Sequence, residues 1–234
     1  MSKKATHGIL YVVATPIGNF EDITLRALRV LKEVDLILCE DTRITRNLLR
    51  HFDIKNKTQS YHAHSSLRRE NEILKMLQGG KKLALVSDAG TPCVSDPGQK
   101  LIAKIIKEIG QEVTISPIPG SNALISTISV AGISAAQFVF LGFLPQKKGR
   151  ERIFEYISNA QVTIAFYESP HRIIKTLGRL HDYLTNKRTV IVGRELTKIY
   201  EEIVRGTPKE VYEYFTDNRE KERGEFVVLI SPEK

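Results

Sequence analysis

The feature that most constrains the fold is the alternation of short apolar runs with amphipathic stretches along the first half of the chain. Amphipathic stretches such as 25–34 and 100–110 have the apolar spacing of one helix face. Between them lie four apolar runs that are typical of strands, at residues 9–15, 35–40, 82–88 and 112–118. Strands that are apolar throughout and joined by helices form a parallel sheet covered on both faces. The sequence therefore predicts an α/β fold whose first sheet is mainly parallel.

A second α/β domain is predicted after "PIPGSNA" (117–123), where prolines and a glycine separate a strand from the next helix. We accordingly expect domains at residues 1–117 and 118–234. The strands of the second domain are expected at 138–144, 162–168, 189–195, 199–206 and 225–231. The short gap around 196–198 indicates an antiparallel hairpin, so the second sheet is predicted to be mixed.

Three local signals predict helix starts. Ser169-Pro170 offers an N-cap followed by proline, and Thr207-Pro208-Lys209-Glu210 is a full capping box. Asp96-Pro97-Gly98-Gln99 has the same character, which favours a structural role for Asp96.

Net charge, cysteine spacing and the length of the apolar runs limit the classes of partner that the chain can bind. The 234 residues carry a net charge of +8, which favours polyanionic partners without identifying nucleic acid. The two cysteines have neither metal-ligand nor disulfide spacing and suit a reducing compartment. No apolar run approaches the roughly 18–20 residues of a membrane span. We expect a soluble cytoplasmic protein with no membrane partner and no metal site.

The segment "ALVSDAGTPCVSDPG" (84–98) contains two Ser-Asp pairs and no lysine or arginine. Asp88 lies where a predicted strand ends, so it either contacts a ligand in the crevice at the strand ends or shapes the turn. Neither glycine-rich phosphate-binding pattern, G-x-G-x-x-G or G-x-x-x-x-G-K-[ST], occurs in the chain. These observations favour a compact, hydroxylated and cationic or zwitterionic ligand over a polyphosphate.

Six motifs then occur in one order over residues 11–198: "YVVATPIGNFEDITLRAL", "EDTR", "VSDAGTPCVSDPG", "PGSNA", "FYESPHR" and "RELTK". Together they resemble the class III (tetrapyrrole-methylase-like) S-adenosylmethionine-dependent methyltransferases. Within that family the set is most similar to the bacterial branch that 2'-O-methylates a cytidine ribose of 16S ribosomal RNA. The "ATPIGN" and "SDAGTP" loops depart from the G-x-G-P-G and G-D-P loops of porphyrin-modifying members, which favours the RNA branch.

The resemblance implies two α/β domains, a cofactor cleft between them, and a homodimer. It also implies which residues contact S-adenosylmethionine. In the first domain these are the loops after the strands: Pro16, Ile17, Gly18, Asp88, Gly90, Thr91, Pro119, Gly120, Ser121 and Asn122. In the second domain Phe166, Tyr167, Leu196 and Thr197 would close over the adenine.

Methyl transfer to a ribose hydroxyl is helped by a general base or by a cation beside the developing alkoxide. Glu168, Asp41 and Lys198 are the predicted catalytic residues, and Glu40 and His171 are further candidates. His171 is equally interpreted as an exposed residue of a first helical turn.

Two basic features are predicted to contact RNA. Arg43, Arg46 and Arg50 recur on one helix face, although a merely solvated face has the same pattern. The loop 145–152 adds Lys147, Lys148 and Arg150, and Arg172 either binds phosphate or pairs with a nearby acid.

The resulting prediction is a methyltransferase that uses S-adenosylmethionine and acts on 16S rRNA or the small ribosomal subunit. Two alternatives stay open: the same fold acting on a small molecule or a protein side chain, and a non-catalytic RNA-binding assembly factor.

Overall fold

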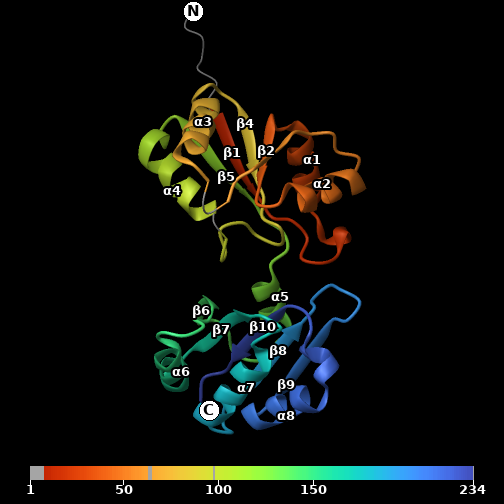
Figure 1. The fold of residues 1–234 in the computed structure, drawn as a ribbon, viewed down its shortest axis with the longest axis vertical. Coiled ribbons are helices and arrows are strands. Elements are labelled where there is room, and N and C mark those ends of the chain that lie inside the picture. The colour runs from red at the N-terminus through yellow and green to blue at the C-terminus, as the bar shows by residue number, and fades with distance from the viewer. Residues whose placement is uncertain (1–7, 63–64, 97, 234) are drawn as a thin grey trace, which may run out of the picture. The chain divides into compact units, whose positions relative to one another are not determined.

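The computed structural model describes residues 8–62, 65–96 and 98–233. The chain forms two compact units, Met1–Asn122 and Ala123–Lys234, each with its own sheet (Figure 1). The division therefore follows Asn122, whereas the sequence suggested residue 117. The segment between these points stays with the first unit because the Ser121 hydroxyl donates a hydrogen bond to the Asp22 carbonyl and the Ser121 carbonyl accepts one from the Thr91 hydroxyl.

The first unit contains five parallel strands in the order β3-β2-β4-β1-β5. The four predicted strands are present, as β1 (Gly8–Val13), β2 (Leu36–Cys39), β4 (Lys82–Leu85) and β5 (Val113–Ile118). The fifth, β3 (Thr58–Ser60), was not predicted. Its three residues are polar, and it is held at the sheet edge by its pairing with β2.

Successive residues of these strands face opposite sides of the sheet, which gives two apolar layers. Leu36 and Leu38 of β2 lie in the layer under α3 (Leu67–Gln78) and α4 (Gly98–Ile109). Ile37 and Cys39 lie in the other layer, under α1 (Leu25–Glu33) and α2 (Thr42–His51). Figure 1 shows these helix pairs on opposite faces of the sheet. The predicted parallel sheet covered on both faces is confirmed.

The neighbouring strands β1 and β4 lead to helices on opposite faces, since α1 follows β1 and α4 follows β4. The loops after these strands therefore diverge at the carboxyl edge of the sheet. In open α/β sheets this is the place where a crevice for ligands forms.

The second unit has a mixed five-stranded sheet in the order β6-β7-β10-β8-β9. Strand β6 (Phe138–Phe143) runs parallel to β7 (Thr163–Glu168), and the remaining pairs are antiparallel. They involve β8 (Val190–Arg194), β9 (Glu202–Gly206) and β10 (Phe226–Ile230). Strands β8 and β9 form the predicted antiparallel hairpin.

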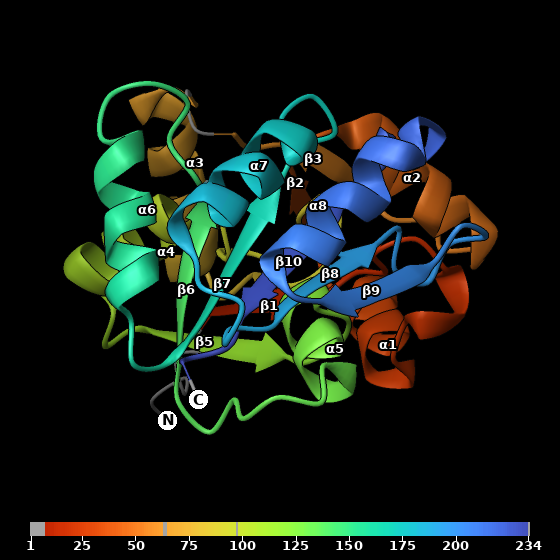
Figure 2. The same cartoon turned by 90° about the horizontal axis from the view of Figure 1, so that it is seen from below.

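Three helices cover one face of this sheet: α6 (Arg150–Asn159), α7 (Ile173–Tyr183) and α8 (Pro208–Asp217) (Figure 2). Helix α5 (Ala123–Val130) packs on the other face. Alternate strand residues again divide between the layers, with Phe166 under α6–α8 and Ala165 on the α5 side.

The three predicted helix starts have different outcomes. The capping box at Thr207 is confirmed, with both reciprocal hydrogen bonds present. The prediction of an N-cap at Ser169 was wrong, because α7 begins at Ile173 and the Ser169 hydroxyl instead accepts a hydrogen bond from Arg172. Helix α4 begins at Gly98, two residues after the predicted cap Asp96, and Pro97, predicted as the first helical residue, falls outside the described residues.

Within the described residues, none of the helices combines the length and the apolar character needed to cross a membrane.

Candidate active site at the carboxyl edge of the first sheet

The loops after β1 and β4 are joined by a short backbone ladder. Thr15 donates its N–H to the Gly90 carbonyl at 2.9 Å and accepts the Gly90 N–H at 3.0 Å. The buried Thr15 hydroxyl also donates to the Ser87 carbonyl at 3.2 Å. The ladder fixes the start of "TPIGN" against "SDAGTP".

Glycine is required at Gly90, whose φ of +76° lies in the left-handed region. A Cβ there would lie 3.2 Å from the Ile17 side chain and 3.6 Å from the Ser121 carbonyl. The position therefore brings together the loops after β1, β4 and β5. Gly120 lies close to the residue that follows β1, since a Cβ there would lie 3.0 Å from that of Ala14.

The predicted cofactor residues of the first unit are thus neighbours in space, although they come from three separate segments. Pro16 and Ile17 are buried and Gly18 is exposed beside them. Thr91 donates its hydroxyl to the Ser121 carbonyl at 3.2 Å, and Pro119 and Gly120 are exposed. Asn122 ends the same loop.

Asp88 links the ends of β4 and β2. Its carboxylate accepts the backbone N–H of Asp41 at 3.0 Å, so it shapes the turn and keeps further lone pairs available. Asp41 caps α2, accepting the Arg43 N–H at 2.7 Å, and forms an ion pair with the Arg43 guanidinium at 2.6 Å. These bonds to Arg43 lower the pKa of Asp41 to about 2. Asp41 is consequently ionised and a weak proton acceptor at neutral pH.

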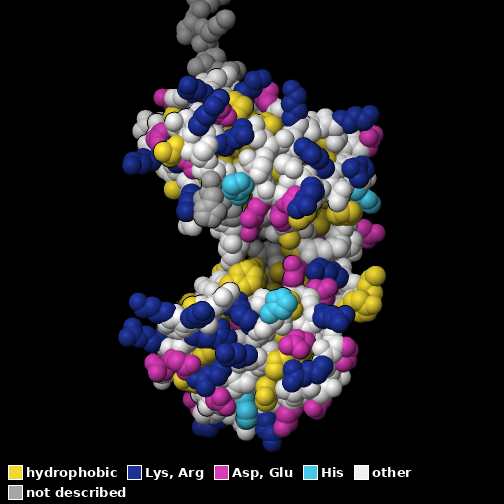
Figure 3. All heavy atoms as spheres, viewed as in Figure 1, with side chains coloured by type: hydrophobic (Ala, Val, Ile, Leu, Met, Phe, Trp, Pro, Cys, Tyr) yellow, Lys and Arg dark blue, Asp and Glu magenta, His cyan; other side chains and the backbone are white. Residues whose placement is uncertain are grey.

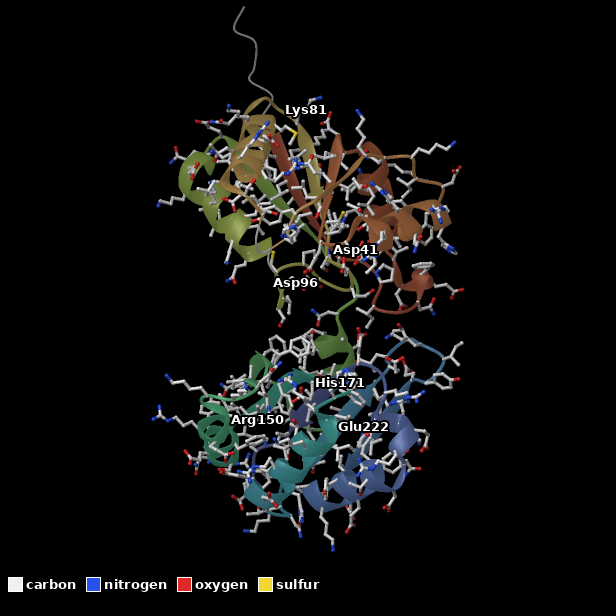
Figure 4. All side chains as sticks on the ribbon, in the orientation of Figure 1. Asp41, Lys81, Asp96, Arg150, His171 and Glu222 are labelled. Carbon is white, nitrogen blue, oxygen red and sulfur yellow. The ribbon has the colours of Figure 1, made fainter. Side chains whose placement is uncertain are left out.

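A small pocket, open to solvent, lies at the same edge. Its polar lining comes from Glu40, Tyr61, Ser87 and Asp96. Burial, reinforced by the charges of Glu40 and Asp88, raises the pKa of Asp96 to about 6. Asp96 was predicted from the sequence to have a structural role, and its place in this pocket was not predicted, although segment 84–98 contains no lysine or arginine. Figure 4 shows Asp41 and Asp96 at this edge of the unit and Lys81 at the opposite one.

The predicted adenine-contacting residues of the second unit differ in accessibility. Phe166 is fully buried under α6–α8, so its side chain is part of the core. Tyr167 is half-buried on the other face, where its ring lies 4.9 Å from that of Phe140.

The turn after β8 contains the other pair, Leu196 and Thr197, both half-buried. Glu195 and Thr197 have φ values of 48° and 66°, a strained region for residues with a Cβ. The Thr197 hydroxyl is buried and has no hydrogen-bond partner among the described residues. A strained turn with an unsatisfied hydroxyl is typical of a ligand-contacting segment.

Two of the predicted catalytic groups are held by internal partners. Lys198 donates to Glu195 at 2.9 Å and to Glu225 at 3.0 Å. Burial opposes its charge, but these bonds prevail and raise its pKa, so Lys198 stays a cation. The Glu168 side chain has 0% exposure and accepts hydrogen bonds from Arg172, Thr176 and the Ser169 N–H. Glu168 therefore does not present a free carboxylate to a substrate hydroxyl, whereas His171 is exposed (Figure 4).

A family model described as Tetrapyrrole (Corrin/Porphyrin) Methylases matches residues 9–212 of the chain. The chain belongs to this family. Its similarity to individual relatives extends further. The chain is 46% identical over 225 residues to the Ribosomal RNA small subunit methyltransferase I of Synechocystis, which covers 96% of the chain and 79% of the relative. It is 44% identical to the protein of that name from Thermotoga maritima, covering 96% of the chain and 98% of the relative.

Solved structures of tetrapyrrole methylases share the fold at low sequence identity. A cobalt precorrin-4 methyltransferase of cobalamin biosynthesis superposes with a TM-score of 0.69 at 18% identity, covering 98% of this chain and 97% of that one. A uroporphyrin-III C-methyltransferase from Thermus thermophilus gives 0.65 at 16% identity, covering 96% and 94%. The predicted fold class is confirmed.

The predicted RNA-binding residues of this tetrapyrrole methylase family member fall into two groups. Arg43, Arg46 and Arg50 are exposed on α2, opposite the buried Leu48 and Leu49. Lys147 and Lys148 are likewise exposed in the loop after β6. Arg150 and Arg172 instead direct their guanidinium groups inward, to Glu168 and to backbone carbonyls.

In the part of the chain that the structure describes, no three His, Cys, Asp or Glu side chains are grouped so that they could hold a metal ion.

Proposed function

We propose that this protein is an S-adenosylmethionine-dependent methyltransferase of small-subunit ribosomal RNA and that it methylates the 2'-hydroxyl of a cytidine ribose. The observation that carries the proposal is the 44–46% identity to rRNA methyltransferases over nearly the whole chain. Four of the six motifs that suggested the same activity contribute loops that the fold brings to one edge of the first sheet.

The residues at this edge fit S-adenosylmethionine. The segment 84–98 has carboxylates and no cation, which suits a ligand with an ammonium group, a sulfonium and a ribose diol. Gly90 and Gly120 let the loops of this edge approach one another closely, and Thr91 and Ser121 lie beside them. Asp88 would accept hydrogen bonds from the ligand. In the second unit, Tyr167, Leu196 and Thr197 remain the proposed adenine contacts.

The cofactor supplies an electrophilic methyl group. The protein's contribution is to hold the ribose oxygen in line with it and to accept the hydroxyl proton. Asp96 lines the pocket, and its pKa of about 6 suits proton transfer near neutral pH better than that of Asp41 at about 2. We propose for Lys198 only the role of a cation that stabilises the developing alkoxide. We propose a homodimer and a cytoplasmic location on the basis of the family and the rRNA substrate.

The experiment is methyl transfer from radiolabelled S-adenosylmethionine to small ribosomal subunits and to naked 16S rRNA, followed by nucleoside analysis. We expect label in 2'-O-methylcytidine. Label in a base, or transfer only to a protein or a small molecule, would replace the proposed acceptor. RNA binding without any transfer would instead identify a non-catalytic assembly factor.

A further inference from the structure

A single buried carboxylate organises two arginines in the second unit. Glu168 ends β7, and its Oε1 accepts from Arg172 at 2.6 Å and from the Ser169 N–H at 2.9 Å. Its Oε2 accepts the Thr176 hydroxyl at 2.7 Å and lies 3.9 Å from Arg150. Arg150 in turn donates to the Thr176 hydroxyl at 2.6 Å. Both guanidinium groups are largely buried and both lie within ion-pair distance of Glu168, whose carboxylate offsets part of their charge.

The other sides of the same guanidinium groups hold the loop 144–149, which follows β6. Arg172 donates to the Leu144 carbonyl at 2.9 Å, and Arg150 donates to the Pro145 carbonyl at 2.9 Å. Lys147 and Lys148 lie two and three residues after Pro145 and are exposed. Figure 3 shows Lys and Arg side chains gathered on the side of this unit where α6 lies.

We propose that Glu168 is a positioning residue that, through Arg150 and Arg172, fixes loop 144–149 so that Lys147 and Lys148 form a preset pair of phosphate contacts for RNA. This inference rests on the proposed function. A loop fixed before binding loses less conformational freedom when it binds, so the two contacts contribute more to affinity than they would on a mobile loop. Glu168, predicted as a base, thereby acts on substrate binding instead of on the proton.

The variant Glu168→Gln separates this role from simple electrostatics. It keeps a hydrogen-bonding side chain but removes one negative charge, which on its own strengthens binding to RNA. Without the carboxylate, Arg150 and Arg172 repel each other and release the carbonyls of Leu144 and Pro145. A positioning role therefore predicts weaker RNA binding from a protein that has become more positive.

The experiment measures the dissociation constant for transcribed 16S rRNA against salt concentration, with S-adenosylmethionine affinity measured in parallel. We expect Glu168→Gln to bind the RNA several-fold more weakly and to lower the salt slope by about 1.4–1.8, the loss of two phosphate contacts. S-adenosylmethionine affinity should not change. Glu213→Gln on α8, an exposed acid paired with Lys209, is the matched control and should bind RNA at least as tightly as the parent.

Combined variants test whether the effect passes through the loop. If it does, adding Glu168→Gln to Lys147→Ala/Lys148→Ala causes no further loss of RNA affinity. Thr176→Val, which removes the hydroxyl between Arg150 and Glu168, supports the same comparison if Glu168→Gln does not fold. Fully additive losses, or unchanged or tighter RNA binding by Glu168→Gln, would overturn the inference while leaving the proposed function intact. A parent protein that neither binds nor methylates rRNA would overturn both.

Discussion

The negative charge of Asp88 is expected to contribute directly to cofactor affinity. The structure allows the charge to be separated from the turn, because Asp88 Oδ1 accepts the Asp41 N–H at 3.0 Å. Asp88→Asn retains an oxygen acceptor there and removes only the charge. A hydrogen bond to a charged group contributes about 1.5–3 kcal/mol, so S-adenosylmethionine should bind about 10- to 150-fold more weakly. Thermal stability should change little.

Asp88→Ala is the informative companion variant. It loses the same ligand contact and also leaves the Asp41 N–H without its partner, which costs about 1–3 kcal/mol of stability. Calorimetric titration gives the affinities, and denaturant unfolding gives the stabilities. If Asp88→Asn binds S-adenosylmethionine as tightly as the parent does and only Asp88→Ala is destabilised, Asp88 merely shapes its turn and our reasoning about the acidic edge is refuted.

Three further predictions use other positions. The folded pKa of Asp96, about 6, exceeds its ordinary value of 3.8, so ionisation of Asp96 costs stability as pH rises through 6. In denaturant unfolding, Asp96→Asn should equal the parent below about pH 4 and, after allowance for solvent screening, should be about 1–2 kcal/mol more stable near pH 8. A stability difference that does not change with pH would contradict this. Gly90→Ala should lower the free energy of unfolding by about 1–2 kcal/mol because of the positive φ, and by a further amount because the new Cβ crowds Ile17. Gly132 has a φ of +72° and no atom within 4 Å of an added Cβ, so thermal melts of Gly132→Ala measure the effect of the positive φ alone. Replacing Arg43, Arg46 and Arg50 by Gln should lower the salt slope of RNA binding by about 2–3 and leave S-adenosylmethionine affinity unchanged. The same change at exposed Lys75, Lys100 and Lys107, on the opposite face of the sheet, should leave the salt slope unchanged. Equal effects on the salt slope would show that the α2 arginines are only a solvated face.

The sheets were predictable because each depends on a pattern that is local in the sequence. Strands such as β2 and β10 are apolar throughout, and the short gap before β9 indicated a hairpin. Strand β3 carries no such pattern. Its polar residues Thr58–Ser60 are extended because β2 offers a free edge, which only the assembled sheet reveals.

Predictions about individual side chains failed where distant residues compete for them. Ser169-Pro170 has a good capping signature, but Arg172 occupies the Ser169 hydroxyl and α7 starts later. Glu168 was expected to face a substrate, whereas Arg150 and Thr176 enclose it. The strand-end loops were predicted better because a turn glycine and an acid next to it, as at Asp88 and Gly90, specify their conformation within a few residues.

Helix α2 begins beside the acidic residues at the carboxyl edge of the first sheet and carries exposed arginines, so it brings together the negative and the positive charges that the proposed reaction needs. The chain is basic overall, yet the loops at the carboxyl edge of the first sheet contain Glu40, Asp88 and Asp96 and would repel phosphate. Asp41 at the start of α2 belongs to this acidic edge, since its N–H binds Asp88, and its ion pair with Arg43 keeps it charged. The exposed arginines begin with Arg43 itself, and Arg46 and Arg50 follow along the same helix. In the proposed reaction, a nucleotide whose phosphates bind those arginines would approach the acidic edge with its uncharged ribose, while its charged backbone would be held back.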